Sequence, residues 1–494
     1  MRLAIVGDTH YCNPRYHRDA LAGRSRSPTA HVDVTRHVWT TEHVLPRLVE
    51  QLRAARPDMV LQLGDVNQGH CDDDAGDVAE LDQALDFFSQ IGRPLLFARG
   101  THEGRAGTPA DVAYRARYLP EIARSLALLG EAAWPSAEGG VRGAPDTSYA
   151  LRAAGLRLIV LDYTTFRAGD AADQLLTAEL AEAAARGERI FVCGHPPLVP
   201  VARPFFSRPE YARTVLERIA QAPAPIDAYF CGHTHNQVAS LHAVQANNTG
   251  DRRGRSAAWL PQLQGAPVGY PDQPPIALED VRPLLPPAGA FRYGWGFLED
   301  SHPGWFLVDV DSDGVRARWQ LVGAEGDHGE VRWQRAGEPT VVGGPPAPER
   351  PELPAFPPRR PDVASVRLRA AGMGSRAPHV VRLNGHAIGT LPVLEYFDAR
   401  QGLAIDERVW SAIGAENELE IEPAAQEERC LGGFVLEVTL ADGRVARSTP
   451  APPLYATADK WDEWRWCTPG LVRVGVSETI RIPLHFMART NRAA

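Results

Sequence analysis

The octapeptide LAIVGDTH at residues 3–10 decides the fold. Its four apolar residues have the composition of a buried strand, and a carboxylate and an imidazole follow where that strand would end. The stretch AYFCGHTH at residues 228–235 repeats this arrangement with two imidazoles. Because open α/β sheets gather ligands at the carboxyl ends of their strands, both stretches predict a binding site at such an edge.

Three further polar motifs lie between these stretches, and each follows a short β-like segment. They are Gly64-Asp65, Gly100-Thr101-His102-Glu103 and Gly194-His195. Together the five motifs supply Asp and His side chains. This mixture is typical of a metal site and not of a site built around a nucleophilic side chain. Such donors suit Mn, Fe or Zn better than an all-oxygen Mg or Ca site, and they are numerous enough to hold two ions that share a carboxylate.

The order of these motifs resembles that of the calcineurin-like metallophosphoesterase superfamily. There, Asp-x-His is followed by Gly-Asp, Gly-Asn-His-Asp/Glu, His and Gly-His-x-His. The resemblance covers residues 1 to about 325. It depends on all five motifs occurring in this order, since a bare Gly-Asp occurs many times by chance. It implies a layered α/β/β/α sandwich with a dinuclear metal site.

The resemblance also implies a role for each matching residue. The expected metal ligands are Asp8, His10, Asp65, Thr101, His195, His233 and His235. Asp65 would bridge two divalent ions, and a metal-bound hydroxide would attack the phosphorus. His102 would protonate the leaving oxygen, with Glu103 orienting it. Thr101 stands where the family has an Asn ligand, and its hydroxyl is a poorer donor, so we expect a weakened second metal site.

Two segments near these motifs each allow two interpretations. The polar stretch 11–40 is either a solvated loop or a lid whose Arg15, His17 and Arg18 contact a substrate phosphate. The insertion 245–300 either walls the substrate pocket or is a structural wrap. Its pocket candidates are the aromatic residues Trp259, Tyr270, Phe291, Tyr293 and Trp295.

Cysteine usage fits a reducing compartment. Cys193 and Cys231 end apolar strands and are expected to be small core residues. Cys12 and Cys71 closely follow the first two motifs, so they are either plain loop residues or thiols that approach the site.

The alternation of strands and helices continues to a hairpin at 305–321, and we assign residues 1–342 to a catalytic domain. A Pro-rich linker at 343–361 follows. Residues 362–494 alternate apolar and polar side chains and predict an all-β sandwich, which loosely resembles the jelly-roll modules of carbohydrate-active enzymes. Its Trp461, Trp464 and Trp466 would either stack on a sugar or pack against a neighbour, such as a second subunit in a homo-oligomer.

The overall composition restricts the partners. The 494 residues carry a formal net charge of −9 and a single lysine, Lys460, which disfavours sequence-independent binding of duplex nucleic acid. Met1-Arg2 leads directly into the first strand, and no apolar stretch is long enough to span a bilayer, so we expect a cytoplasmic protein without a membrane partner.

The sequence therefore predicts a metal-dependent phosphoester hydrolase that acts on a small or sugar-linked phosphate ester. One alternative is a phosphodiesterase for cyclic nucleotides or single-stranded nucleic acid, since the segment 194–197 (GHPP) is similar to the cyclic-nucleotide branch. The replacement of the family Asn by Thr101 leaves a second alternative, either a metal-binding scaffold or a non-standard reaction.

Overall fold

The structure is a computed structural model. It describes residues 1–24, 30–104, 107–135, 147–199, 209–235, 237–245, 257–265, 291–299, 303–335, 340–343, 356–369, 377–391, 402–425, 429–431, 434–448, 454–456, 472–474 and 477–486.

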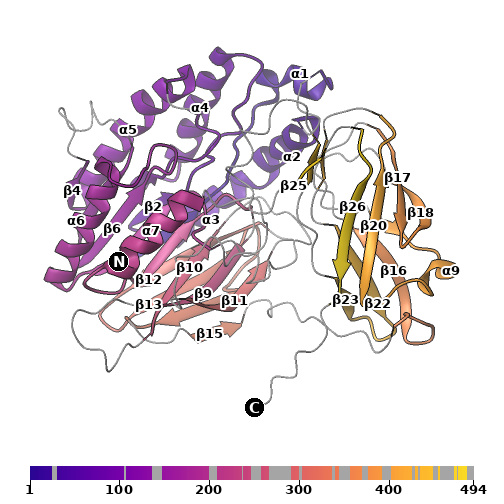
Figure 1. The fold of residues 1–494 in the computed structure, drawn as a ribbon. Coiled ribbons are helices and arrows are strands. Elements are labelled where there is room, and N and C mark those ends of the chain that lie inside the picture. Colours follow the sequence, from indigo (N-terminus) through magenta and orange to yellow (C-terminus); the bar gives the residue numbers. More distant parts are fainter. Residues whose placement is uncertain are drawn as a thin grey trace.

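Two mixed sheets form the N-terminal part of the chain (Figure 1). In order across the first sheet, the strands are β15 (Thr340–Gly343), β14 (Gly329–Trp333), β13 (Val315–Leu321), β12 (Gly304–Val310), β1 (Arg2–Val6), β2 (Met59–Gln62) and β3 (Leu95–Phe97). The second sheet runs β11 (Phe291–Glu299), β9 (Gln237–Gln245), β10 (Ala257–Gln264), β8 (Ala228–Cys231), β7 (Arg189–Gly194), β6 (Leu156–Leu161), β5 (Tyr149–Ala153) and β4 (Glu131–Ala133).

Helices cover the outer faces of both sheets, as the resemblance predicted. Those of the first half are α1 (Arg18–Leu21), α2 (Ala30–His43), α3 (Leu45–Ala55), α4 (Asp74–Ser89) and α5 (Pro109–Leu129), preceded by the 3-10 turn η1 (Pro14–Tyr16). Those of the second half are α6 (Ala171–Arg186) and α7 (Pro209–Gln221). Strand β6 shows the layering: Leu158 and Val160 join the core shared by both sheets and α3 to α5, while Ile159 joins the core under α6 and α7.

The prediction for segment 11–40 was only partly correct. The segment was expected to be a loop, but it holds η1, α1 and most of α2. The mixture of His, Arg and Asp hides its helical periodicity, and Ala20 and Val34 bury a small core of their own together with Cys12. The insertion at 245–300 contributes β10 and β11 to the second sheet. The side chains of its five aromatic candidates lie outside the described residues.

The C-terminal part is an all-antiparallel sandwich of two sheets, shown in orange and yellow in Figure 1. One sheet runs β19 (Gly402–Ala404), β16 (Val363–Arg369), β22 (Val435–Leu440) and β23 (Val445–Arg447), and the other β18 (His386–Leu391), β17 (His379–Leu383), β20 (Glu416–Glu422) and β26 (Ile480–His485). The C-terminal part also holds the short helix α9 (Glu407–Trp410) and a small sheet of β21 (Arg429–Leu431), β24 (Leu454–Ala456) and β25 (Val472–Val474), in which β24 and β25 are parallel.

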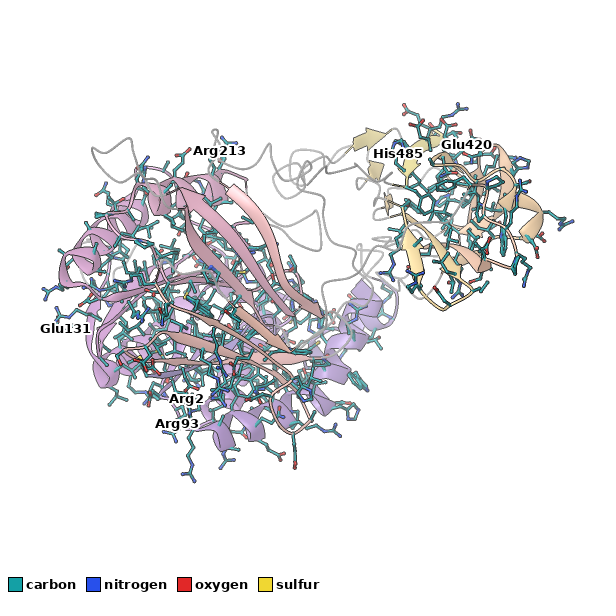
Figure 2. All side chains as sticks on the ribbon, turned by 90° about the horizontal axis from the view of Figure 1, so that it is seen from below. Arg2, Arg93, Glu131, Arg213, Glu420 and His485 are labelled. Carbon is teal, nitrogen blue, oxygen red and sulfur yellow. The ribbon has the colours of Figure 1, made fainter. Side chains whose placement is uncertain are left out.

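Alternating side chains of both sandwich sheets share one core, which includes Leu368, Leu383, Ile421 and Leu436. The predicted Asn-Gly turn joins β17 to β18, with Asn384 at φ 50°. Charged side chains cover the outside of both parts, where Figure 2 labels Arg2, Arg93 and Glu131 on the first part and Glu420 on the second. The three tryptophans at 461, 464 and 466 lie outside the described residues, so their role stays a prediction.

Candidate metal centre

The predicted motifs meet at the carboxyl ends of parallel strands. Asp8 and His10 follow β1, and Asp65 follows β2, its parallel partner. His195 follows β7 directly, and His233 follows β8, which is parallel to β7. The two sheets thus present these side chains to a common edge, as the strand pattern predicted.

Six of the seven predicted ligands form two groups that share one residue. The first group is Asp8, His10, Asp65 and His235, and the second is Asp65, His195 and His233. Within each group all ligand atoms lie within 4.8 Å of one another. The Oδ2 atom of Asp65 lies 3.1 Å from Nε2 of His195 and 3.7 Å from Nε2 of His10. Asp65 therefore stands where a carboxylate can serve two ions.

Hydrogen bonds behind the rings turn one nitrogen of each histidine toward the centre. The Nδ1 atom of His195 is 2.8 Å from the Leu63 carbonyl oxygen, so Nδ1 donates and Nε2 faces Asp65. His10 is held through Nδ1 by the side-chain oxygen of Gln68 at 3.0 Å. Its Nε2 then lies 3.0 Å from Nε2 of His235. Two nitrogens that face each other at this distance need a shared proton or a cation, and second partners of this kind are typical of metal-binding histidines. The residues therefore fit a divalent ion.

The centre also concentrates buried negative charge. Asp8, Asp65 and Glu103 are each at most 1% exposed. Burial raises the pKa of Asp8 well above its ordinary value, and the nearby Asp65 carboxylate raises it further. Burial alone would lower the pKa of His195, but Asp65, Asp8 and Glu103 raise it to about 9. These carboxylates thus favour a cation beside them.

The motif loops adopt a strained backbone at the ligands. Nine described residues other than glycine have a positive φ, and five of them are predicted ligands. These five are Asp8, His10, Asp65, His233 and His235, with φ between 42° and 77°. Such conformations cost on the order of 1 kcal/mol or more each and concentrate at functional sites. The motif glycines make close approach possible: a Cβ at Gly232 would lie 2.7 Å from Oδ2 of Asp8.

Thr101 and His102 dock on the shared carboxylate. The hydroxyl of Thr101 lies 3.1 and 3.2 Å from the two oxygens of Asp65. The backbone N–H of His102 donates to Oδ1 of Asp65 at 2.9 Å. Thr101 therefore reaches the ligand region, and its hydroxyl is within bonding distance of Asp65; whether it ligates a metal stays a prediction.

The structure corrects the role expected for Glu103. Its carboxylate accepts hydrogen bonds from the backbone N–H groups of Val66 and Gly100, not from the ring of His102. Glu103 thus ties the loop after β2 to the loop after β3. His102 is oriented through Nδ1 by the backbone carbonyl of Gln68. The sequence shows only that Glu103 immediately follows His102. It does not show that the carboxylate turns toward the backbone.

His37 is a site residue that the sequence did not single out. It lies on α2, where a loop was expected, and is 2% exposed. Its ring stacks on that of His10, with centroids 4.3 Å apart and planes at 18°. Burial and then His10 lower the pKa of His37 well below its ordinary value, so the ring is neutral. The sequence signal that could have indicated His37 is the high histidine content of segment 11–40.

The substrate candidates of segment 11–40 lie in different settings. Arg15 and Arg18 are exposed, and the guanidinium of Arg15 packs over the ring of Tyr16. His17 is buried, with Nε2 2.8 Å from Glu80 Oε1, so it is not on a surface that a substrate reaches. Substrate contact through the two arginines stays a prediction.

Residues 1–237 match the family described as calcineurin-like phosphoesterase. The matched part holds the six predicted ligands that form the two donor groups, and members of that family use divalent metals. No curated protein matches the chain.

Several solved structures are similar to the chain. A dimetal phosphatase from Danio rerio has 14% identity and a TM-score of 0.40, over 69% of this chain and 98% of that one. Zn-bound Vps29 from Entamoeba histolytica has 9% identity and a TM-score of 0.24 over 69% and 98%, and Vps29 from Chaetomium thermophilum has 11% and 0.24 over 69% and 96%. These TM-scores are too low to carry an inference about this chain.

Among the described residues, no helix combines the length and the apolar composition needed to cross a bilayer.

Proposed function

We propose that this protein is a metal-dependent hydrolase that acts on a phosphate ester of a small or sugar-linked molecule. The observation that carries the proposal is Asp65, whose carboxylate belongs to two groups of buried metal donors at the ends of parallel strands. Two metal sites that share a carboxylate suit phosphoryl transfer, because the entering and the leaving oxygen both need positive charge nearby.

The first ion would be held by Asp8, His10 and His235, and the second by His195 and His233, with Asp65 between them. Bound divalent ions supply charge neutralisation for the phosphoryl oxygens and lower the pKa of water. Imidazole and carboxylate donors favour Mn, Fe or Zn as the native ions. Thr101 offers a hydroxyl where the family offers a carboxamide, so the second ion would bind less tightly.

His102 would hold the proton for the leaving group. Its Nδ1 bonds to the Gln68 carbonyl, which leaves Nε2 for a substrate, and its backbone amide fixes it beside Asp65. The ring is partly exposed, whereas the predicted ligands His10 and His195 are buried. A proton donor needs this access to the substrate, and a purely structural histidine does not.

The proposal is tested by comparing metal content with turnover. The full-length protein is stripped of metal, and Mn, Fe(II) or Zn is added back while an aryl phosphate and an aryl phosphodiester are assayed. We expect two ions per chain at the shared centre and hydrolysis of one ester class, with Asp65→Asn losing both metal and activity. A protein that binds the ions but hydrolyses neither ester, or any of a panel of sugar and nucleotide phosphates, would contradict the proposal.

That last result would favour the second candidate, a metal-stabilised scaffold. The observation in its favour is Thr101, whose exposed side chain hydrogen-bonds to Asp65.

A further inference from the structure

A second set of metal-binding side chains lies behind the shared carboxylate. Cys12, His17 and Glu80 form a group in which the sulfur, one ring nitrogen and one carboxylate oxygen all lie within 4.8 Å of one another. All three side chains are buried, at 1%, 1% and 0% exposure. A fourth donor is adjacent, because the sulfur of Cys71 lies 3.7 Å from Nε2 of His17. None of these four side chains belongs to the centre described above.

We propose that these four side chains form a separate structural site for a zinc-like divalent ion, with Cys12, His17, Cys71 and Glu80 as its ligands. Sulfur, nitrogen and oxygen donors are the kinds that hold structural zinc, which takes four ligands. Thiolate sulfur selects soft ions over Mg or Mn, so this site and the Asp/His centre would differ in metal preference.

The present hydrogen bonds show how the site would accept an ion. Oε1 of Glu80 lies 2.8 Å from Nε2 of His17 and 2.9 Å from the N–H of Asn13. Two ligands of one tetrahedral zinc stand roughly 3.4 Å apart, given metal bonds of about 2.0–2.2 Å. The ion would thus replace the proton between His17 and Glu80, and the two side chains would separate by about half an ångström.

The positions of the four ligands indicate a structural role for the ion. Cys12 follows β1 and the first motif, His17 lies between η1 and α1, and Cys71 and Glu80 lie before and within α4. Hydrogen bonds already join these segments, such as that from Asp72 N–H to the Tyr16 carbonyl and that from Arg18 N–H to the Asp72 carboxylate. An ion bound here would further link segment 11–40 to α4.

Glu80 also connects the proposed site to the loop that carries Asp65. Its second oxygen, Oε2, accepts from the side-chain amide of Asn67 at 3.1 Å and from the N–H of Gly69 at 2.8 Å. Gln68, between these two residues, orients both His10 and His102. Loss of the ion is therefore expected to loosen the loop without removing a ligand of the Asp/His centre.

Cobalt(II) is the probe that distinguishes the two sites, because only a cobalt bound by thiolate gives a sulfur-to-metal charge-transfer band. The metal-free full-length protein is titrated with cobalt(II), and the absorbance and total bound metal are followed. We expect a sulfur band that saturates at one ion per chain. Cys12→Ser and Cys71→Ser should each reduce it strongly and lower the affinity of that ion at least tenfold.

Matched variants separate this site from the Asp/His centre and from other cysteines. Asp65→Asn should keep the band, because it alters only the Asp/His centre. Cys193→Ser and the double variant Cys430→Ser with Cys467→Ser should also keep it. Absence of the band in the wild type, or its persistence in both Cys12→Ser and Cys71→Ser, overturns the proposal. If circular dichroism shows that Cys12→Ser fails to fold, the less buried Cys71 decides the outcome.

Discussion

Replacing His102 by alanine should separate proton donation from metal binding. The ring holds no position in either donor group, and its Nδ1 is engaged by the Gln68 carbonyl. Its removal should cost about 1 kcal/mol of stability, the worth of one ordinary hydrogen bond, and leave metal content unchanged. Turnover of an alkyl phosphate should fall roughly 10²- to 10⁴-fold, which is about 3–5 kcal/mol of transition-state stabilisation. For an ester with an acidic phenol as leaving group, the loss should shrink to about tenfold or less.

The assay is steady-state hydrolysis of a series of aryl and alkyl esters, with bound metal measured on the same samples. His70→Ala is the matched control, since this exposed histidine contacts the His102 ring at 4.9 Å between centroids but has no assigned role. Equal losses for every leaving group would refute the proton-donor role. A parallel loss of metal would instead make His102 a ligand.

Other changes test the remaining parts of the reasoning. Asp65→Asn should lower bound metal and abolish turnover, because the shared carboxylate serves both donor groups; near-normal turnover would contradict the two-metal assignment. Thr101→Asn should raise the affinity of the second ion in a metal titration, and an unchanged affinity would show that position 101 does not reach the ion. Asp173→Asn tests the pH dependence of stability: burial raises the pKa of Asp173, but Arg218 and the Gly169 N–H lower it overall. A lowered pKa stabilises the fold above the unfolded value of about 3.9 and ceases to do so as the pH falls through the folded value. Thermal melts of the metal-free protein should therefore show a deficit for Asp173→Asn at pH 7 that shrinks below about pH 4; an equal deficit at both pH values would count against the ion pair.

The sequence predicted the strand ends well because both signals there are local. An apolar run such as residues 3–6 can be read as a buried strand, and a polar residue just after it must lie at the sheet edge. The order of Asp8, Asp65, His195 and His233 along the chain was therefore enough to place them together. The family match over residues 1–237 confirms the recognition.

Segment 11–40 shows where such reasoning stops. Its helix α2 places His37 against His10 through tertiary packing, which no spacing in the sequence encodes. The direction of a side chain is equally hidden: Glu103 and His17 both turn from the expected partner toward buried backbone or carboxylate groups. Each of these side chains makes a hydrogen bond to a polar group that is buried only in the folded chain.

Two buried glutamates hold the strained loop that carries Asp65. Asp65 has a φ of 53° and His10 a φ of 42°, conformations that a free loop would leave. Glu103 accepts from the Val66 amide beside Asp65 and from the Gly100 amide of the loop after β3, and Glu80 holds the Asp65 loop at Asn67 and Gly69. A hydrogen bond contributes roughly 0.5–1.5 kcal/mol net, so these four together are comparable to the backbone strain of the two ligands. The ligands of the Asp/His centre are therefore positioned by two carboxylates that do not belong to that centre.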